Sequence, residues 1–154
     1  MLGLYTGSRP GNLLSLTWDQ VDLERRVLRR TLLAQDAKKR APPVRLGARI
    51  LAHLRRWKRL DGGHIKYVCH YDKYVCHYDG RAVEDPHASW HKVTKAAGLP
   101  DVTRHTLRHT RATWLAQAGI PLFEAAGFLG MTVKTLENVY AHHHPDWQER
   151  AANV

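Results

Sequence analysis

The chain of 154 residues has only two cysteines and lacks any long apolar run. Two cysteines cannot build the disulfide framework that holds small secreted domains together, so a reducing, cytoplasmic setting is the simplest expectation. A membrane-spanning helix needs about 18 or more consecutive apolar residues, and no such stretch is present. The first residues have neither a basic segment nor a long apolar segment, and they do not resemble a signal peptide.

Acidic residues are scarce relative to basic ones. The chain has 14 Asp and Glu against 24 Lys and Arg, which gives a formal net charge of +10. This excess favours a polyanionic partner, and DNA or RNA ranks above a membrane because no long basic amphipathic helix stands out. We therefore expect DNA or RNA as the partner, and neither a membrane nor a small-molecule substrate.

The apolar pattern predicts one mostly helical α+β domain. A chain of this length can bury a single core. Residues 21–33 and 44–46 have strand-like patterns on either side of a basic turn, which predicts a small antiparallel sheet near the N-terminus. Helices are expected before residue 6, from Pro10 with Ser8 as its cap, and from Thr132 to Tyr140 with Val133 and Leu136 on the buried side. Further helices are predicted, from apolar spacing and end signals, over 46–57, 86–97, 106–118 and 121–129.

One heptapeptide, KYVCHYD, occurs at residues 66–72 and again without a change at 73–79. A single duplication does not make a solenoid, and we interpret it as an insertion in a connection that tolerates change. A metal site is the alternative interpretation of the two Cys-His pairs. Zinc sites normally use closer cysteine spacing, and in a continuous strand Cys69 and Cys76 would lie on opposite faces. We expect no metal and no cofactor.

Two arginines, a histidine and a late tyrosine together provide the groups for phosphodiester chemistry. Such chemistry needs a nucleophile, cations on the non-bridging oxygens and an acid for the leaving oxygen. Arg9 follows a turn, and His105 and Arg108 are spaced to face one target from a helix. Tyr140 can serve as a covalent nucleophile. Taken singly, each has an ordinary explanation, as a surface arginine, a capping histidine or a core tyrosine.

Four motifs resemble, in order, those of the tyrosine recombinases, the phage-integrase type of site-specific recombinase. They are TGSRP at residues 6–10, HTLRHT at 105–110, FLGM at 128–131 and VYAHHH at 139–144. Each motif alone is moderately specific, but four at fitting spacing make a strong match over nearly the whole chain. The resemblance implies an α+β catalytic domain covering residues 1–154.

The resemblance also implies roles for four residues. Arg9 and Arg108 would clamp the scissile phosphate, and His105 would assist proton transfer. Tyr140 would form a covalent 3′-phosphotyrosyl link and release a 5′-hydroxyl. Since this link conserves the energy of the phosphodiester, strands would be rejoined without ATP or a metal.

The family's general acid is a lysine in the turn of its sheet, and Lys38 is our assignment, with Lys39 as the alternative. After the Leu-Gly pair the family most often has histidine or tryptophan as a phosphate contact, where this chain has Met131. A thioether cannot donate a hydrogen bond, which could cost about a hundredfold in rate. His109 or one of the histidines at 142–144 could supply the missing donor.

Further departures concern Asn12, where the family commonly has glutamate, and the start of the chain. Family members usually carry an amino-terminal helical DNA-binding domain, and this sequence begins within the helix before the first arginine motif. We interpret it as a catalytic domain truncated at its N-terminus, which would self-associate on DNA as family tetramers do. A degenerate fragment that binds DNA without strand exchange is the alternative, and an RNA-binding protein without cleavage activity has only the charge in its favour.

Overall fold

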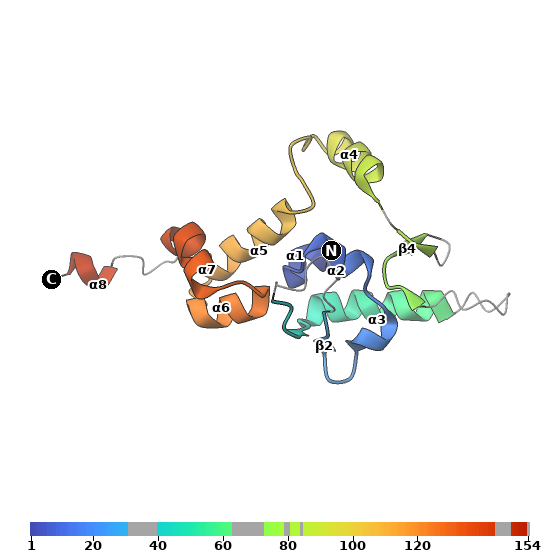
Figure 1. Ribbon diagram of the computed structural model, residues 1–154, viewed down its shortest axis with the longest axis horizontal. Coiled ribbons are helices and arrows are strands. Elements are labelled where there is room, and N and C mark those ends of the chain that lie inside the picture. Colours follow the sequence, from blue (N-terminus) through green and yellow to red (C-terminus); the bar gives the residue numbers. More distant parts are fainter. Residues whose placement is uncertain (31–39, 63–72, 79–80, 84, 144–148, 154) are drawn as a thin grey trace.

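The computed structural model describes residues 1–30, 40–62, 73–78, 81–83, 85–143 and 149–153. Helices dominate, and a three-stranded antiparallel sheet lies near the N-terminus, which confirms the α+β expectation (Figure 1). The elements up to the second sheet are α1 (Leu2–Thr6), α2 (Pro10–Leu14), the 3₁₀ helix η1 (Trp18–Gln20), β1 (Val21–Asp22), β2 (Val27–Leu28), β3 (Val44–Arg45), α3 (Ala48–Gly62), β4 (His77–Tyr78) and β5 (Arg81–Ala82). The remaining elements are α4 (His87–Ala96), α5 (Thr106–Gln117), α6 (Leu122–Leu129), α7 (Val133–Tyr140), the 3₁₀ helix η4 (Ala141–His143) and α8 (Glu149–Ala152).

The first sheet has the strand order β1-β2-β3, and both pairings are antiparallel. Leu28 pairs with Val21 on one side and Val44 on the other, and all three side chains are buried. The strands are shorter than predicted, because residues 23–26 form a turn. Residues 31–33, also expected to be strand, lie outside the described residues.

The predicted cap of α2 is wrong. Pro10 occupies the first turn as expected, but the residue before the helix is Arg9, with no side-chain cap bond. Ser8 is instead buried, and its hydroxyl accepts a hydrogen bond of 2.9 Å from Thr6 Oγ1. The hydroxyl is therefore satisfied by the preceding helix, and the fixed φ of proline starts the new one.

The cap of α7 is confirmed. Thr132 Oγ1 accepts a hydrogen bond of 3.1 Å from the backbone N–H of Thr135. Leu136 is buried as predicted and Tyr140 is buried beside it, whereas the prediction of a buried Val133 is wrong, since this residue is 38% exposed. Val133 lies in the first turn of the helix, beyond the edge of the core that the later residues contact.

Buried side chains form two clusters. The first joins α1, the segment around η1, the sheet and α3, and the second joins α5, α6 and α7 (Figure 1). The first comprises Leu2, Leu16, Trp18, Val21, Leu28, Leu46, Ile50, Leu51, Leu54 and Val75. The second comprises Ala112, Ala116, Ala125, Ala126, Leu129, Leu136 and Tyr140. Several alanines in the second cluster allow its three short helices to approach closely.

The second copy of the heptapeptide takes part in the first cluster. Val75 is buried, and its N–H donates to the carbonyl of Leu16 at 2.9 Å. Tyr74 forms an isolated antiparallel bridge with Thr17. The interpretation of the repeat as an insertion in a tolerant connection is therefore wrong for this second copy, which packs into the core. The first copy, including Cys69, lies outside the described residues, and burial raises the pKa of the Cys76 thiol.

Helix α4 stands away from the two clusters (Figure 1). The indole N–H of Trp90 donates to the carbonyl of Val102 at 2.7 Å, which ties the helix to the segment that leads into α5. Most other side chains of α4 are exposed. Within the described part of the chain, no helix is long and apolar enough to cross a bilayer.

Candidate active site

A cavity of about 390 Å³ is lined by residues from the turn after α1, from α5, from the end of α6 and from α7. Five residues expected from the sequence line it together, namely Arg9, His105, Arg108, Met131 and Tyr140. The other lining residues are Arg40, His109, Gly130, Thr132, Thr135 and Val139. Lys38 and Lys39 lie outside the described residues.

Arg108 joins the turn after α1 to the end of α6. Its guanidinium is buried, and Nη1 donates to the carbonyl oxygens of Gly7 and Leu129, each at 2.6 Å. Nη2 donates to the carbonyl of Gly130 at 3.5 Å. Burial and the charge of Arg9 lower the pKa of Arg108 to about 10, although Tyr140 acts in the opposite direction. All three of these acceptors are neutral carbonyls, so at neutral pH the guanidinium keeps its full positive charge.

Arg9 lies half-buried at the edge of the same cavity. Nη1 donates to the backbone carbonyl of Arg40 at 2.9 Å, and Nη2 donates to that of Gly130 at 3.2 Å. The carbonyl of Gly130 thus accepts from both Arg9 and Arg108. One backbone group at the end of α6 thereby sets the spacing of two guanidinium groups that are distant in sequence.

Two glycines make this arrangement possible. Gly7 has a φ of +60°, and a Cβ there would come within 2.4 Å of Leu129 Cδ2. Gly130 has a φ of +67°, and a Cβ there would lie 2.9 Å from the carbonyl oxygen of Arg40. Both positions need a left-handed backbone and a close approach, which only glycine provides without strain. These requirements explain the glycines of the first and third motifs.

Tyr140 ends α7 with its side chain directed toward α5. The residue is 5% exposed, and its hydroxyl hydrogen-bonds to Nδ1 of His109. The His109 ring also contacts that of His105 edge-on, with centroids 5.1 Å apart. Burial raises the pKa of Tyr140, and the nearby charge of Arg108 opposes the rise. The phenol is therefore protonated at neutral pH.

The sequence interpretation missed Arg30. This arginine is buried, and Nε donates to the carbonyl of Pro42 at 2.7 Å. Its Nη2 and Nη1 donate to the carbonyls of Phe128 and Leu129, at 2.9 and 3.4 Å. Burial, followed by the charges of Arg108 and Arg9, lowers its pKa to about 10. Arginine is rarely buried, so a sequence interpretation places Arg30 at the surface like its basic neighbours. No motif around Arg30 indicates otherwise.

The cavity is built for an anion. None of the residues that line it in the described part of the chain is acidic. Arginine forks bind two phosphate oxygens at once and stay charged. Within the same described ranges, no three metal-ligating side chains lie close enough together to hold an ion.

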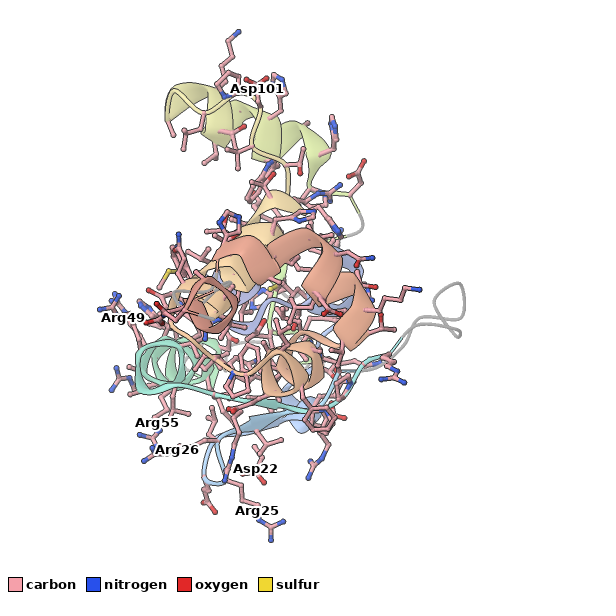
Figure 2. The ribbon with its side chains drawn as sticks, turned by 90° about the vertical axis from the view of Figure 1, so that its left-hand side faces the viewer. Asp22, Arg25, Arg26, Arg49, Arg55 and Asp101 are labelled. Carbon is pink, nitrogen blue, oxygen red and sulfur yellow. The ribbon has the colours of Figure 1, made fainter. Side chains whose placement is uncertain are left out.

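Other arginines lie outside the cavity. Arg25, Arg26, Arg49 and Arg55 project outward from the sheet turn and α3 (Figure 2).

Asn12, on α2, is not among the residues that line the cavity. Its side chain is buried, and within the described residues Oδ1 has no hydrogen-bond partner. A neutral amide is therefore held where a carboxylate would be expensive to bury without a partner.

Comparison with known proteins assigns this architecture to a family. The model of the phage integrase family matches residues 1–146. The integrase of Salmonella phage P22 is 30% identical over 150 residues, which cover 93% of this chain and 38% of that protein. The chain therefore belongs to the phage integrase family of tyrosine recombinases, as a member of its catalytic-domain class.

Solved structures show the same fold. The Tn1549 transposon integrase in complex with circular intermediate DNA has a TM-score of 0.76 at 23% identity, covering 99% of this chain and 55% of that one. The XerA recombinase has a TM-score of 0.72 at 23% identity, covering 99% and 54%. The catalytic domain of bacteriophage HP1 integrase has a TM-score of 0.64 at 22% identity, covering 99% and 77%. The chain thus spans about half the length of the first two of these proteins.

Proposed function

We propose that this chain is the catalytic domain of a site-specific DNA recombinase, which cleaves and rejoins strands through a 3′-phosphotyrosyl link on Tyr140. The observation that carries the proposal is the meeting of Arg9, Arg108 and Tyr140 at one cavity whose described lining has no carboxylate. A phosphodiester entering this cavity would meet two guanidinium groups and a phenol. Family membership supports the same reaction.

The contacts of the two arginines support roles on the non-bridging oxygens. Both are held by backbone carbonyls, so their positions are set before any ligand binds. Preorganised cations stabilise the charge of a phosphorane-like transition state without reorganising during the reaction. His105 lines the same cavity, in keeping with assistance in proton transfer. Lys38 remains our proposal for the acid that protonates the leaving 5′ oxygen.

Double-stranded DNA is the proposed partner. The net charge of +10 favours a polyanion, and the related Tn1549 integrase was solved in complex with circular intermediate DNA. We further propose that residues 1–154 form one catalytic domain that self-associates on DNA. During recombination, this domain would act together with an equivalent of the part of the relatives that lies outside the match.

One observation favours a second candidate function, DNA binding without strand exchange. Met131 lines the cavity at the position where the family most often places a hydrogen-bond donor. A thioether cannot donate to a phosphate oxygen, so the transition state would lose a contact while the ground-state clamp by Arg9 and Arg108 is kept.

A nicked suicide substrate separates the two functions. Cleavage beside the nick releases a short fragment, so the covalent protein–DNA product cannot be resealed and is seen on a denaturing gel. We expect that product with the native chain and its loss in Tyr140→Phe. Tyr5→Phe is the matched control, since Tyr5 accepts a hydrogen bond from Arg49 outside the cavity. DNA retention without any covalent product would support the binder.

A further inference from the structure

We propose that His109 is the base that removes the phenolic proton of Tyr140 as this tyrosine attacks the phosphate. The inference deepens the proposed function and rests on it for the identity of the nucleophile. His109 directly follows Arg108 on α5, so the helix that holds a phosphate clamp would also hold the proton acceptor.

Geometry is the first support. The Tyr140 hydroxyl hydrogen-bonds to Nδ1 of His109, and the two ring centroids are 5.9 Å apart. The phenol comes from the end of α7 and the imidazole from the first turns of α5, so packing between these helices sets the contact. His109 is exposed, which allows the proton it accepts to exchange with solvent.

The chemistry of the other charged groups is the second support. Among the described residues, the charged and titratable groups that line the cavity beside Tyr140 and His109 are His105, Arg9, Arg40 and Arg108. At neutral pH the arginines are protonated and cannot accept a proton. His105 contacts the His109 ring edge-on and leaves Nδ1 of His109 facing the phenol. Of these described groups, His109 is therefore the one that can accept a proton and that also hydrogen-bonds to the nucleophile.

The proton balance defines the step. The Oη–H bond of Tyr140 breaks, and its proton passes to Nδ1 of His109 while the Oη–P bond forms. The P–O5′ bond breaks, and the leaving oxygen takes a proton from a separate acid. Religation reverses the step, with the imidazolium returning its proton to the departing phenol.

Proton transfer during the attack suits the two groups. A phenol holds its proton more tightly than an imidazolium does, so the proton rests on the tyrosine until the new bond begins to form. Burial raises the pKa of Tyr140 further, so attack at neutral pH needs an acceptor. General bases with pKa values near the working pH contribute about 10²- to 10⁴-fold in rate.

The free protein provides the first test. In ¹⁵N spectra at pH 8, Nδ1 of His109 should be the unprotonated nitrogen, and Tyr140→Phe should move its resonance. A proton resident on Nδ1 at this pH would overturn the inference. This arm needs no cleavage, so it decides whether Nδ1 of His109 is free to accept the phenolic proton even if the chain proves to be a DNA binder.

The second test is single-turnover cleavage by His109→Asn. The amide oxygen can accept the phenolic hydrogen bond, but it cannot take the proton. We expect a loss of about a hundredfold with unchanged DNA affinity, and loss of the rate increase that accompanies histidine deprotonation. Added imidazole should restore part of the rate in His109→Ala. The control is His91→Asn, an exposed histidine on α4.

The outcomes separate the two claims. If the native chain makes no covalent product, the proposed function fails and the spectra still decide the state of His109. If the native chain cleaves and His109→Asn keeps a rate within threefold of it with the same pH profile, then His109 is not the base.

Discussion

Arg30 and Arg108 donate hydrogen bonds to the same carbonyl oxygen, that of Leu129, at 3.4 and 2.6 Å. The carbonyls at the end of a helix lack partners within the helix and carry the negative end of its dipole. Here three guanidinium groups meet that need, since Arg9 bonds the neighbouring carbonyl of Gly130. The end of α6 is therefore the anchor on which the cations of the cavity are arranged.

Arg30→Met should destabilise the fold although Arg30 does not line the cavity. The carbonyls of Pro42 and Phe128 would lose donors inside the protein, at a cost of about 2 kcal/mol in the free energy of unfolding. Urea unfolding measures this change. Arg29→Met, at an exposed neighbouring arginine, is the control and should change stability by less than about 0.5 kcal/mol. Equal midpoints for both variants would contradict the role of Arg30 as an anchor.

Phosphate should stabilise the free protein through the cavity. Burial lowers the pKa of Arg108 to about 10, so at neutral pH the folded state carries a guanidinium that would be less costly in water. A bound anion offsets this cost, by about 2.7 kcal/mol at a hundred times its dissociation constant. The effect should weaken as the pH rises through about 10, where Arg108 begins to lose its proton in the folded state.

Thermal melting in phosphate and in chloride at equal ionic strength measures this effect. Arg9→Gln is the control for general salt stabilisation, because Arg9 is exposed enough to change without emptying the core. A rise in melting temperature that is equal in Arg9→Gln and the native chain would show that phosphate acts elsewhere.

Gly7→Ala should be far more damaging than Gly98→Ala. Both glycines have positive φ, at +60° and +71°, so alanine is strained at each by about 1 kcal/mol. Only at Gly7 would the new Cβ also meet another side chain, Leu129 Cδ2 at 2.4 Å, whereas at Gly98 it meets nothing within 4 Å. Overpacking adds about 1–3 kcal/mol. Chemical denaturation of the two variants isolates this second cost, and equal losses would rule out the close packing of the turn.

Met131→His should raise the rate of covalent product formation if the chain cleaves DNA. Met131 lines the cavity with Arg9, Arg108 and Tyr140, and a histidine there could donate to a non-bridging oxygen. One such donor is worth about a hundredfold in rate. Single-turnover cleavage of the nicked substrate gives the comparison, with Met131→Leu as the control that adds no donor. A histidine variant no faster than the leucine variant would mean that the cavity does not place residue 131 at the phosphate.

Local rules made part of the fold predictable. The start of α7 followed from the threonine cap of Thr132. The same rules failed at Ser8, because a buried contact with Thr6 took the hydroxyl that a cap would have used. The burial of Val75 was also missed, because the repeat looked like an insertion. Its hydrogen bond with Leu16 joins residues that are far apart in the sequence, so no local pattern indicates it.

The sequence by itself determined the order of the motifs, the helices that carry them and the candidates Arg9, His105, Arg108 and Tyr140, because caps, turns and helical spacing act over a few residues. Only the tertiary structure decided that Arg30 supports the same helix end and that His109 meets the phenol. Such contacts depend on how the two buried clusters pack against each other, and the spacing of residues along one helix or strand carries no record of that packing.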